Sequence, residues 1–300
     1  MYHGIMNVYK EKGYTSHDVV AKLRGICKQK KIGHTGTLDP DAVGVLPVCL
    51  GNATKICDML TDQDKEYIAV LKLGVVTDTQ DSSGTVLKEC EVKASVDEAV
   101  KAVYSFQGDI LQVPPMYSAL KVGGKKLYEL ARQGQVVERA PRPVTIHEIE
   151  ILEENMPELT VRVVCSKGTY IRTLCHDIGE KLGCGGIMAS LKRTRVGKFQ
   201  IEQALTLSEL EAFSREDKLA EHLIPVDRFF SYLPPVTVKQ ESLKALRNGN
   251  QLKKTECNWQ TEGEPEGQYR VYSHEGYFFG IYNYDRRKRL LCPVKMFLEE

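Results

Sequence analysis

The chain has 300 residues, and its 41 lysines and arginines nearly cancel its 40 aspartates and glutamates, which leaves a net charge of +1. This balance excludes attraction to a polyanion through overall charge, so any contact with nucleic acid must come from local clusters of basic residues. The length suggests two domains, and no apolar run approaches membrane-spanning length. The odd number of cysteines and the lack of an export segment fit a reducing cytosol, so we expect a cytoplasmic protein.

The N-terminal half combines strand and helix patterns. Residues 5–9 predict a strand, and residues 17–30 predict an amphipathic helix with Thr15 or Ser16 as its N-cap. Residues 67–76 are rich in valine, leucine and isoleucine, which is typical of a buried strand. Ser95 and Glu98 form the pattern of a capping box and predict a helix that runs to about residue 106.

The middle of the chain continues the same mixture. Residues 144–152 and 159–165 predict paired strands with a turn between them, and residues 170–182 predict a helix. Thr206 and Glu209 form a second capping-box pattern, which opens a helix through about residue 213. These elements indicate an α+β domain with a mixed, largely antiparallel central sheet and flanking helices.

A domain boundary is expected near Pro234 and Pro235. Beyond it the sequence predicts a strand at 236–239, a helix at 240–247, and strands at 269–273, 277–284 and 290–298. This pattern indicates a small β-rich module. Residues 255–268, which combine glycine, proline and acidic residues, predict a mobile loop within it.

The most informative motif begins at Gly33 and reads Gly-His-Thr-Gly-Thr-Leu-Asp-Pro. Its glycines permit backbone angles that other residues resist, and the proline that follows Asp39 restricts the conformation of that aspartate. We therefore expect Asp39 to be held on a structured loop. Taken alone, such a motif more often marks a turn than a catalytic site.

Five segments occur in the order of the motifs of the TruB family of bacterial tRNA pseudouridine-55 synthases, which the chain resembles over about its first four-fifths. They are residues 33–55, 65–81, 114–121, 166–172 and 191–197. The resemblance implies a long central sheet with an active-site cleft. It also implies a catalytic domain at 1–232 with a basic RNA-clamping insertion at about 112–147, and a PUA-like RNA-binding domain at 233–300.

The resemblance implies that the chain converts uridine to pseudouridine in the TΨC loop of tRNA, at position 55, without a cofactor. It assigns Asp39 as the covalent nucleophile and Arg172 as its partner, whose guanidinium would keep the carboxylate ionised. Tyr67 matches the ring that stacks on the uracil and is a candidate to remove the C5 proton. Tyr170 matches a second ring near the base, and Leu191 matches an apolar wall of its pocket.

RNA contacts are expected from His34, which matches a position whose imidazole packs against the RNA, and from basic residues. Between Leu120 and Arg142 there are six basic residues against two acidic ones, with tyrosines interleaved. Although such charge runs are usually solvated faces, this one resembles a flexible clamp over RNA. The candidate basic contacts are Lys55, Lys121, Lys125, Lys126, Arg132, Arg142, Lys192 and Arg193.

The nine cysteines are scattered singly without a CxxC pair, which disfavours zinc and a disulfide framework. The expected partner is the T arm of tRNA, with no membrane, no obligatory protein partner and a monomeric state. Two alternatives stay open: a synthase that acts on another RNA or is guided by one, and a tRNA-folding chaperone with incidental catalysis. Glu11 and Val43 depart from the family pattern, and Glu11 is hypothesised to lower RNA affinity.

Overall fold

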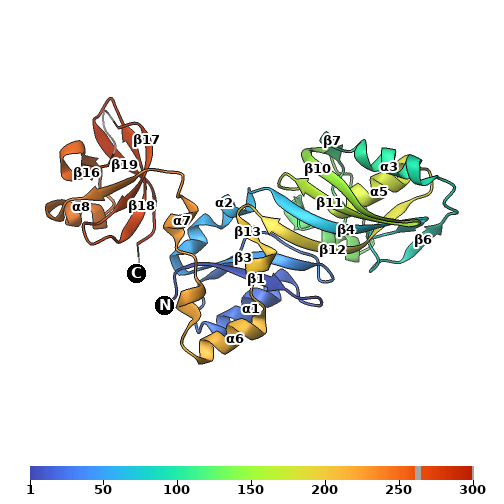
Figure 1. Ribbon diagram of the computed structural model, residues 1–300, viewed down its shortest axis with the longest axis horizontal. Helices are drawn as coiled ribbons and strands as arrows, with labels where there is room; N and C mark the ends of the chain where they lie inside the picture. The colour runs from blue at the N-terminus through green and yellow to red at the C-terminus, as the bar shows by residue number, and fades with distance from the viewer. Residues whose placement is uncertain (261–264, 299–300) are drawn as a thin grey trace.

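The computed structural model describes residues 1–260 and 265–298, and these contain two large β-sheets, shown in Figure 1, and two smaller sheets of two strands each. The larger sheet has nine strands and carries the expected mixture of pairings. Seven strands follow one another across it: β1 (Gly4–Lys10), β3 (Val43–Leu50), β12 (Gly186–Val196), β4 (Lys65–Leu73), β11 (Glu158–Cys165), β10 (Arg142–Asn155) and β7 (Gly108–Gln112). Two short strands, β2 (Ile32–His34) and β13 (Phe199–Gln200), pair with β3 and β12.

Helices cover this sheet in two groups. Helices α1 (Ser16–Ile26) and α6 (Leu207–Arg215) bury their apolar sides against β1 and β3. Helices α3 (Val96–Tyr104) and α5 (Ile171–Lys181) pack on β4, β10 and β11. The capping boxes expected at Ser95 and Thr206 are confirmed, because each side chain accepts a backbone N–H three residues on. Of the two N-caps expected for the first helix, Thr15 is the one observed, and it also forms a capping box.

Buried and partly exposed side chains alternate along β4 and β11. Along β4 every second side chain is buried, including Tyr67, Ala69 and Leu71, so one face of this strand packs against the helices. Gly74 ends the strand with a φ of +88°, and β5 (Val75–Thr77) then pairs with β6 (Val86–Glu89). The single strand expected at 67–76 is therefore two strands.

The central strand β12 was not predicted, because its segment was interpreted as a basic RNA contact. It pairs antiparallel with β4 and parallel with β3, and so joins the two halves of the sheet. Polar and charged residues interrupt its apolar pattern: the hydroxyl of Thr194 donates to Glu66 on β4 at 2.8 Å, and Arg195 forms an ion pair with the same carboxylate at 3.8 Å. Charged side chains paired across strands do not produce an alternating apolar pattern.

The second sheet forms the small β-rich module expected after residue 233. Its order is β15 (Leu252–Lys253), β19 (Leu290–Met296), β18 (Phe278–Asp285), β17 (Gly267–Tyr272), β14 (Pro235–Val238) and β16 (Cys257–Trp259), with α8 (Leu243–Arg247) beside it. Strand β16 lies within the segment 255–268 that was expected to be a loop, so that expectation was wrong there, while residues 261–264 lie outside the described residues.

Short elements complete the chain. Helices α2 (Cys57–Thr61) and α7 (Val226–Phe229) lie between the two sheets (Figure 1), and Phe297 from the end of the chain joins a core cluster with Ile5 and Val45. The insertion after β7 contains the hairpin β8 (Lys121–Val122) and β9 (Lys125–Lys126), followed by α4 (Leu127–Arg132). Among the described residues, no helix combines the length and apolar character needed to cross a membrane.

The parallel contact between β3 and β12 requires glycine at position 44. Gly44 has a φ of +109°, and a Cβ there would lie 2.1 Å from the carbonyl oxygen of Arg193. We expect Gly44→Ala to lower the free energy of unfolding by about 3 kcal/mol or more, because strained backbone and a backbone clash add. The matched control is Gly13→Ala, with a φ of +88° and open space around it, which should cost about 1 kcal/mol. Equal losses in urea unfolding would contradict this explanation.

Candidate active site

Asp39 lies on the loop between β2 and β3, and a buried lysine binds the backbone of this loop. Lys10 is fully buried at the end of β1, and its ammonium donates to the carbonyl oxygens of Pro40 and Ala42, at 3.0 Å and 2.6 Å. Burial lowers the pKa of Lys10 to about 8, with the charge of Asp39 opposing the shift. The backbone N–H of Gly13 also donates to Pro40, at 2.9 Å. Lys10 was not predicted as a site residue, because a single lysine at the end of a strand does not indicate that its side chain is buried.

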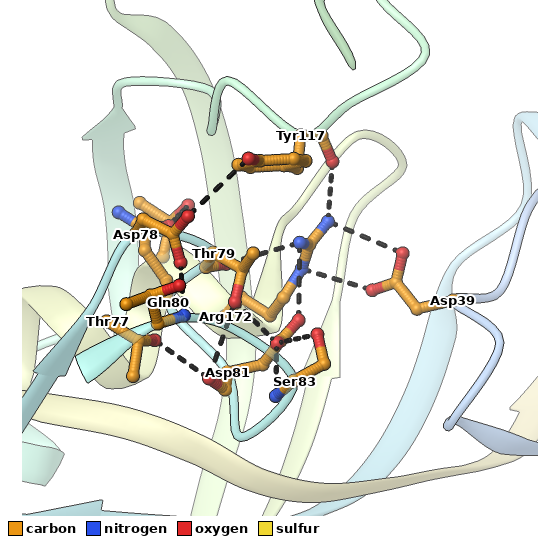
Figure 2. Close-up of polar contacts among 11 residues, drawn as sticks. Asp39, Thr77, Asp78, Thr79, Gln80, Asp81, Ser83, Tyr117 and Arg172 are labelled. Carbon is orange, nitrogen blue, oxygen red and sulfur yellow. Dashed lines mark hydrogen bonds and ion pairs between the residues drawn. The ribbon is translucent and has the colours of Figure 1, made fainter. Parts of the chain in front are cut away.

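Arg172 is the centre of the polar site, as Figure 2 shows. It sits in the first turn of α5 and is only 6% exposed. Its Nε and Nη2 contact both carboxylate oxygens of Asp39, at 3.1 Å and 3.4 Å. Its Nη1 lies 3.4 Å from Asp81 and donates to the carbonyl of Thr79, while Nη2 donates to the carbonyl of Tyr117 at 2.9 Å. One planar cation therefore fixes the direction of Asp39 and links it to two other loops.

Asp81 is the second carboxylate on Arg172, and its Oδ1 accepts three further hydrogen bonds. It accepts from the hydroxyl of Thr79 at 2.7 Å and from both the backbone and the hydroxyl of Ser83, at 3.0 Å and 2.6 Å. Its side chain is 13% exposed, against 36% for Asp39. Of the two carboxylates, Asp39 is therefore the one with an open face. Asp81 belongs to the second motif, yet nothing in that motif separates it from Asp78.

The electrostatics of Asp39 differ from the expectation that Arg172 simply keeps it ionised. Burial raises the pKa of Asp39 above its ordinary value; Arg172 opposes this shift and the charge of Asp81 adds to it. Because the guanidinium is shared between two carboxylates, it does not fully offset the burial of Asp39. The carboxylate is aimed and accessible, and it is more basic than an ordinary aspartate.

The predicted pocket residues surround this pair. Tyr67 on β4 and Leu191 on β12 are 8% and 9% exposed and share a core cluster with Leu38, which precedes Asp39. Tyr170 is the N-cap of α5, and its backbone exchanges two hydrogen bonds with the side chain of Gln112 on β7. Burial raises the pKa of both tyrosines, and the charge of Asp39 acts on both hydroxyls. The structure thus brings Asp39, Arg172, Tyr67, Tyr170 and Leu191 together.

His34 lies at the end of β2, beside the same loop. Its Nδ1 is 3.1 Å from the carbonyl oxygen of Gly36, and its ring meets His17 edge-on with centroids 5.1 Å apart. Burial lowers the pKa of His34, which favours the neutral imidazole. A neutral, partly exposed ring next to the loop is compatible with packing against a base.

The predicted basic contacts separate into two groups. Most belong to the insertion, and Lys192 lies on β12. In the insertion, Lys126 and Arg132 lie over the ring of Tyr128, 5.4 Å and 5.5 Å from its centroid. The exposed members are Lys121, Lys125, Arg132, Arg142 and Lys192, and Lys126 is half-buried.

Two of the predicted contacts have other positions. Lys55 is exposed, but its ammonium donates to the carbonyl of Met296 at 2.9 Å and so ties the first motif to the C-terminal module. Arg193 is only 1% exposed, inside the large sheet, so its prediction as a surface contact to RNA was wrong. The alternation of β12 places Lys192 outward and Arg193 inward.

Replacement of the two carboxylates on Arg172 should affect the free energy of unfolding differently. Asp81→Asn should lower the free energy of unfolding by about 2 kcal/mol, because a buried group that accepts several hydrogen bonds loses its charge and one acceptor. Asp39→Asn should not lower it: a carboxyl whose pKa is raised on folding opposes folding when it is ionised at neutral pH. Urea unfolding of both variants checks this, and equal destabilisation would contradict it.

With this geometry in place, comparisons with known proteins identify the family. The model of the TruB family pseudouridylate synthase N-terminal domain matches residues 24–171, and that of the tRNA pseudouridylate synthase B C-terminal domain matches residues 172–231. The tRNA pseudouridine synthase B of Lachnoclostridium phytofermentans is 56% identical over 99% of this chain and 100% of its own length. That of Alkaliphilus oremlandii is 46% identical over 99% of both chains.

Solved structures agree with these relatives. A structure of an H/ACA RNP bound to a substrate RNA containing 2′-deoxyuridine superposes with a TM-score of 0.71 and 27% identity, over 99% of this chain and 86% of the other. A Cbf5-Nop10-Gar1 complex gives a TM-score of 0.71 and 29% identity, over 99% and 85%. These matches confirm the expected fold class. The chain belongs to the TruB family of pseudouridylate synthases.

Proposed function

We propose that this chain is a tRNA pseudouridine synthase that isomerises the uridine at position 55, in the TΨC loop, with Asp39 as its nucleophile and no cofactor. The observation that carries the proposal is the shared guanidinium of Arg172: it holds two carboxylates, and the one with an open face is Asp39. The full-length relatives that carry the name tRNA pseudouridine synthase B support the substrate.

The reaction breaks the bond between C1′ of the ribose and N1 of the uracil, turns the base, and joins C1′ to C5. An ionised carboxylate aimed at the nucleoside supplies the covalent nucleophile, and the paired contact with Arg172 supplies the aim. The C5 proton then leaves so that the C5–C6 double bond is restored. The phenolate of Tyr67, buried beside Asp39, receives that proton, and the bond to Asp39 breaks so that the free carboxylate is restored.

The target uridine reaches Asp39 only after it leaves its base stack, at a cost of a few kcal/mol. His34, Tyr170 and Leu191 would line the pocket that receives the base, since rings and an apolar wall replace the lost stacking. The exposed basic residues of the insertion and Lys192 would hold the backbone of the T arm.

The domain organisation and partners belong to the same proposal. Residues 1–232 form the catalytic domain with an RNA-clamping insertion at about 112–147, and residues 233–300 form a PUA-like RNA-binding domain. Both the six-stranded sheet and the exposed hairpin β8–β9 are compatible with these roles. The protein acts as a monomer on bare tRNA in the cytoplasm and without an obligatory protein partner, in contrast to a guided synthase.

Asp39→Asn is expected to abolish tritium release from unmodified tRNA labelled at uridine C5, by about a thousandfold or more, and to leave tRNA affinity within about threefold of the parent. The matched control is Asp41→Asn, an exposed carboxylate two residues away, which should keep the parent rate. Release by Asp39→Asn at the parent rate would overturn the assignment. Binding without release by the parent itself would instead favour a chaperone or a guided enzyme.

As the pH is lowered, the rate should begin to fall at a higher pH than it would for an aspartate with an ordinary pKa. The nucleophile must be ionised, and its pKa is raised, so activity is lost as pH falls through a value above about 4. Asp81→Asn removes a negative charge that contributes to this shift, so it should move the acid limb to lower pH. Single-turnover rates measured against pH check both, and a parent rate that stays flat down to about pH 4 would contradict the assignment.

A further inference from the structure

Arg193 is a buried cation without a carboxylate partner among the described residues. It is 1% exposed, its Nε donates to the carbonyl of Val45 at 2.7 Å, and no described residue accepts a hydrogen bond from its Nη2. A buried charge without a counterion costs several kcal/mol, so such a group usually serves a purpose that repays the cost. Its donor Nη2 is available for another group inside the sheet.

The groups around Arg193 are themselves basic, so burial of its charge among them should destabilise the fold. Lys10 on β1, Lys65 on β4 and His34 on β2 all lie close enough for their charges to interact with it, and all three are basic. Burial lowers the pKa of Lys65 to about 8, and Arg193 adds to the shift. A neutral side chain of similar length would relieve this repulsion.

The phenol of Tyr67 is the acidic group that faces Arg193. The two residues are direct cross-strand partners on β12 and β4, so their side chains leave the same face of the sheet. Burial raises the pKa of Tyr67, and the positive charge of the neighbouring Arg193 opposes this shift. The other titratable groups that face Tyr67 are Cys165 on β11 and Asp39 on the loop, and negative charge on either of them raises the pKa of Tyr67 further.

We propose that Arg193 is the positioning residue of Tyr67: its guanidinium holds the phenol oxygen and stabilises the phenolate that removes the C5 proton. The inference rests on the proposed function. The phenol first loses its proton to water; the C5–H bond then breaks, its electron pair restores the C5–C6 double bond, and the proton joins the phenolate oxygen. Arg193 keeps its own protons throughout, which suits a guanidinium.

The experiment compares single-turnover pseudouridine formation and tRNA affinity for Arg193→Met, Arg193→Lys and the parent. Arg193→Met should slow the reaction by about tenfold or more, because loss of a neighbouring positive charge moves a pKa by one unit or more. Arg193→Lys keeps the charge and should recover part of the rate. Affinity for tRNA should stay within about threefold of the parent, because the side chain is buried.

A second arm separates electrostatics from packing. Replacement of Tyr67 by 3-fluorotyrosine, a more acidic phenol of nearly the same shape, should restore part of the rate of Arg193→Met, which a packing defect would not allow. If Arg193→Met does not fold, 3-fluorotyrosine is introduced at position 67 of Arg193→Lys instead. The smaller loss of rate in Arg193→Lys should then be partly restored.

The outcomes distinguish the inference from the function on which it rests. An active parent whose Arg193→Met loss is not rescued by fluorination would overturn the role of Arg193 alone. A loss that appears as weaker tRNA binding would show that Arg193 contacts the RNA instead, and would also overturn it. An inactive parent would refute the proposed function itself.

Discussion

A single buried guanidinium organises this site. Arg172 is shared by two carboxylates that differ in every other respect: Asp81 is nearly enclosed and accepts from Thr79 and Ser83, whereas Asp39 keeps an open face. The enclosed carboxylate anchors the arginine, and the arginine aims the open one. Because the positive charge is divided, burial still raises the pKa of Asp39, which makes this carboxylate more basic than an isolated ion pair would allow.

The sheet itself imposes the second constraint. Strand β12 must lie between β3 and β4, and it reaches β3 only where Gly44 leaves room for the backbone of Arg193. The same strand places Leu191 and Arg193 on the inner face, next to Tyr67. Strand β12, which connects the two halves of the sheet, therefore also lines the proposed pocket. Substitutions on this strand should affect both stability and catalysis.

Much of this arrangement could be predicted from the sequence. Runs rich in apolar and β-branched residues indicated β4, β10 and β11, and two capping-box patterns marked the starts of two helices. The resemblance to the family motifs supplied Asp39 and Arg172, which are separated by 133 residues along the chain and which no local pattern could have paired.

Other features had no local signal. Strand β12 was not predicted because Lys192, Arg193 and Arg195 interrupt its apolar pattern, and only the register shows that Arg193 lies inside the sheet. Asp81 differs from Asp78 only in the contacts it makes, and Lys55 reaches a carbonyl 241 residues away. These properties come from tertiary packing, which residue type alone does not specify.

The central claim is that Arg172 aims Asp39, and the most direct measurement is single-turnover pseudouridine formation by Arg172→Lys, with tRNA affinity measured alongside. A lysine keeps the charge but cannot contact both oxygens of Asp39 and still reach Asp81. We expect the rate to fall by about a hundredfold or more while affinity for tRNA changes little. A rate within about threefold of the parent in a folded Arg172→Lys variant would contradict the claim.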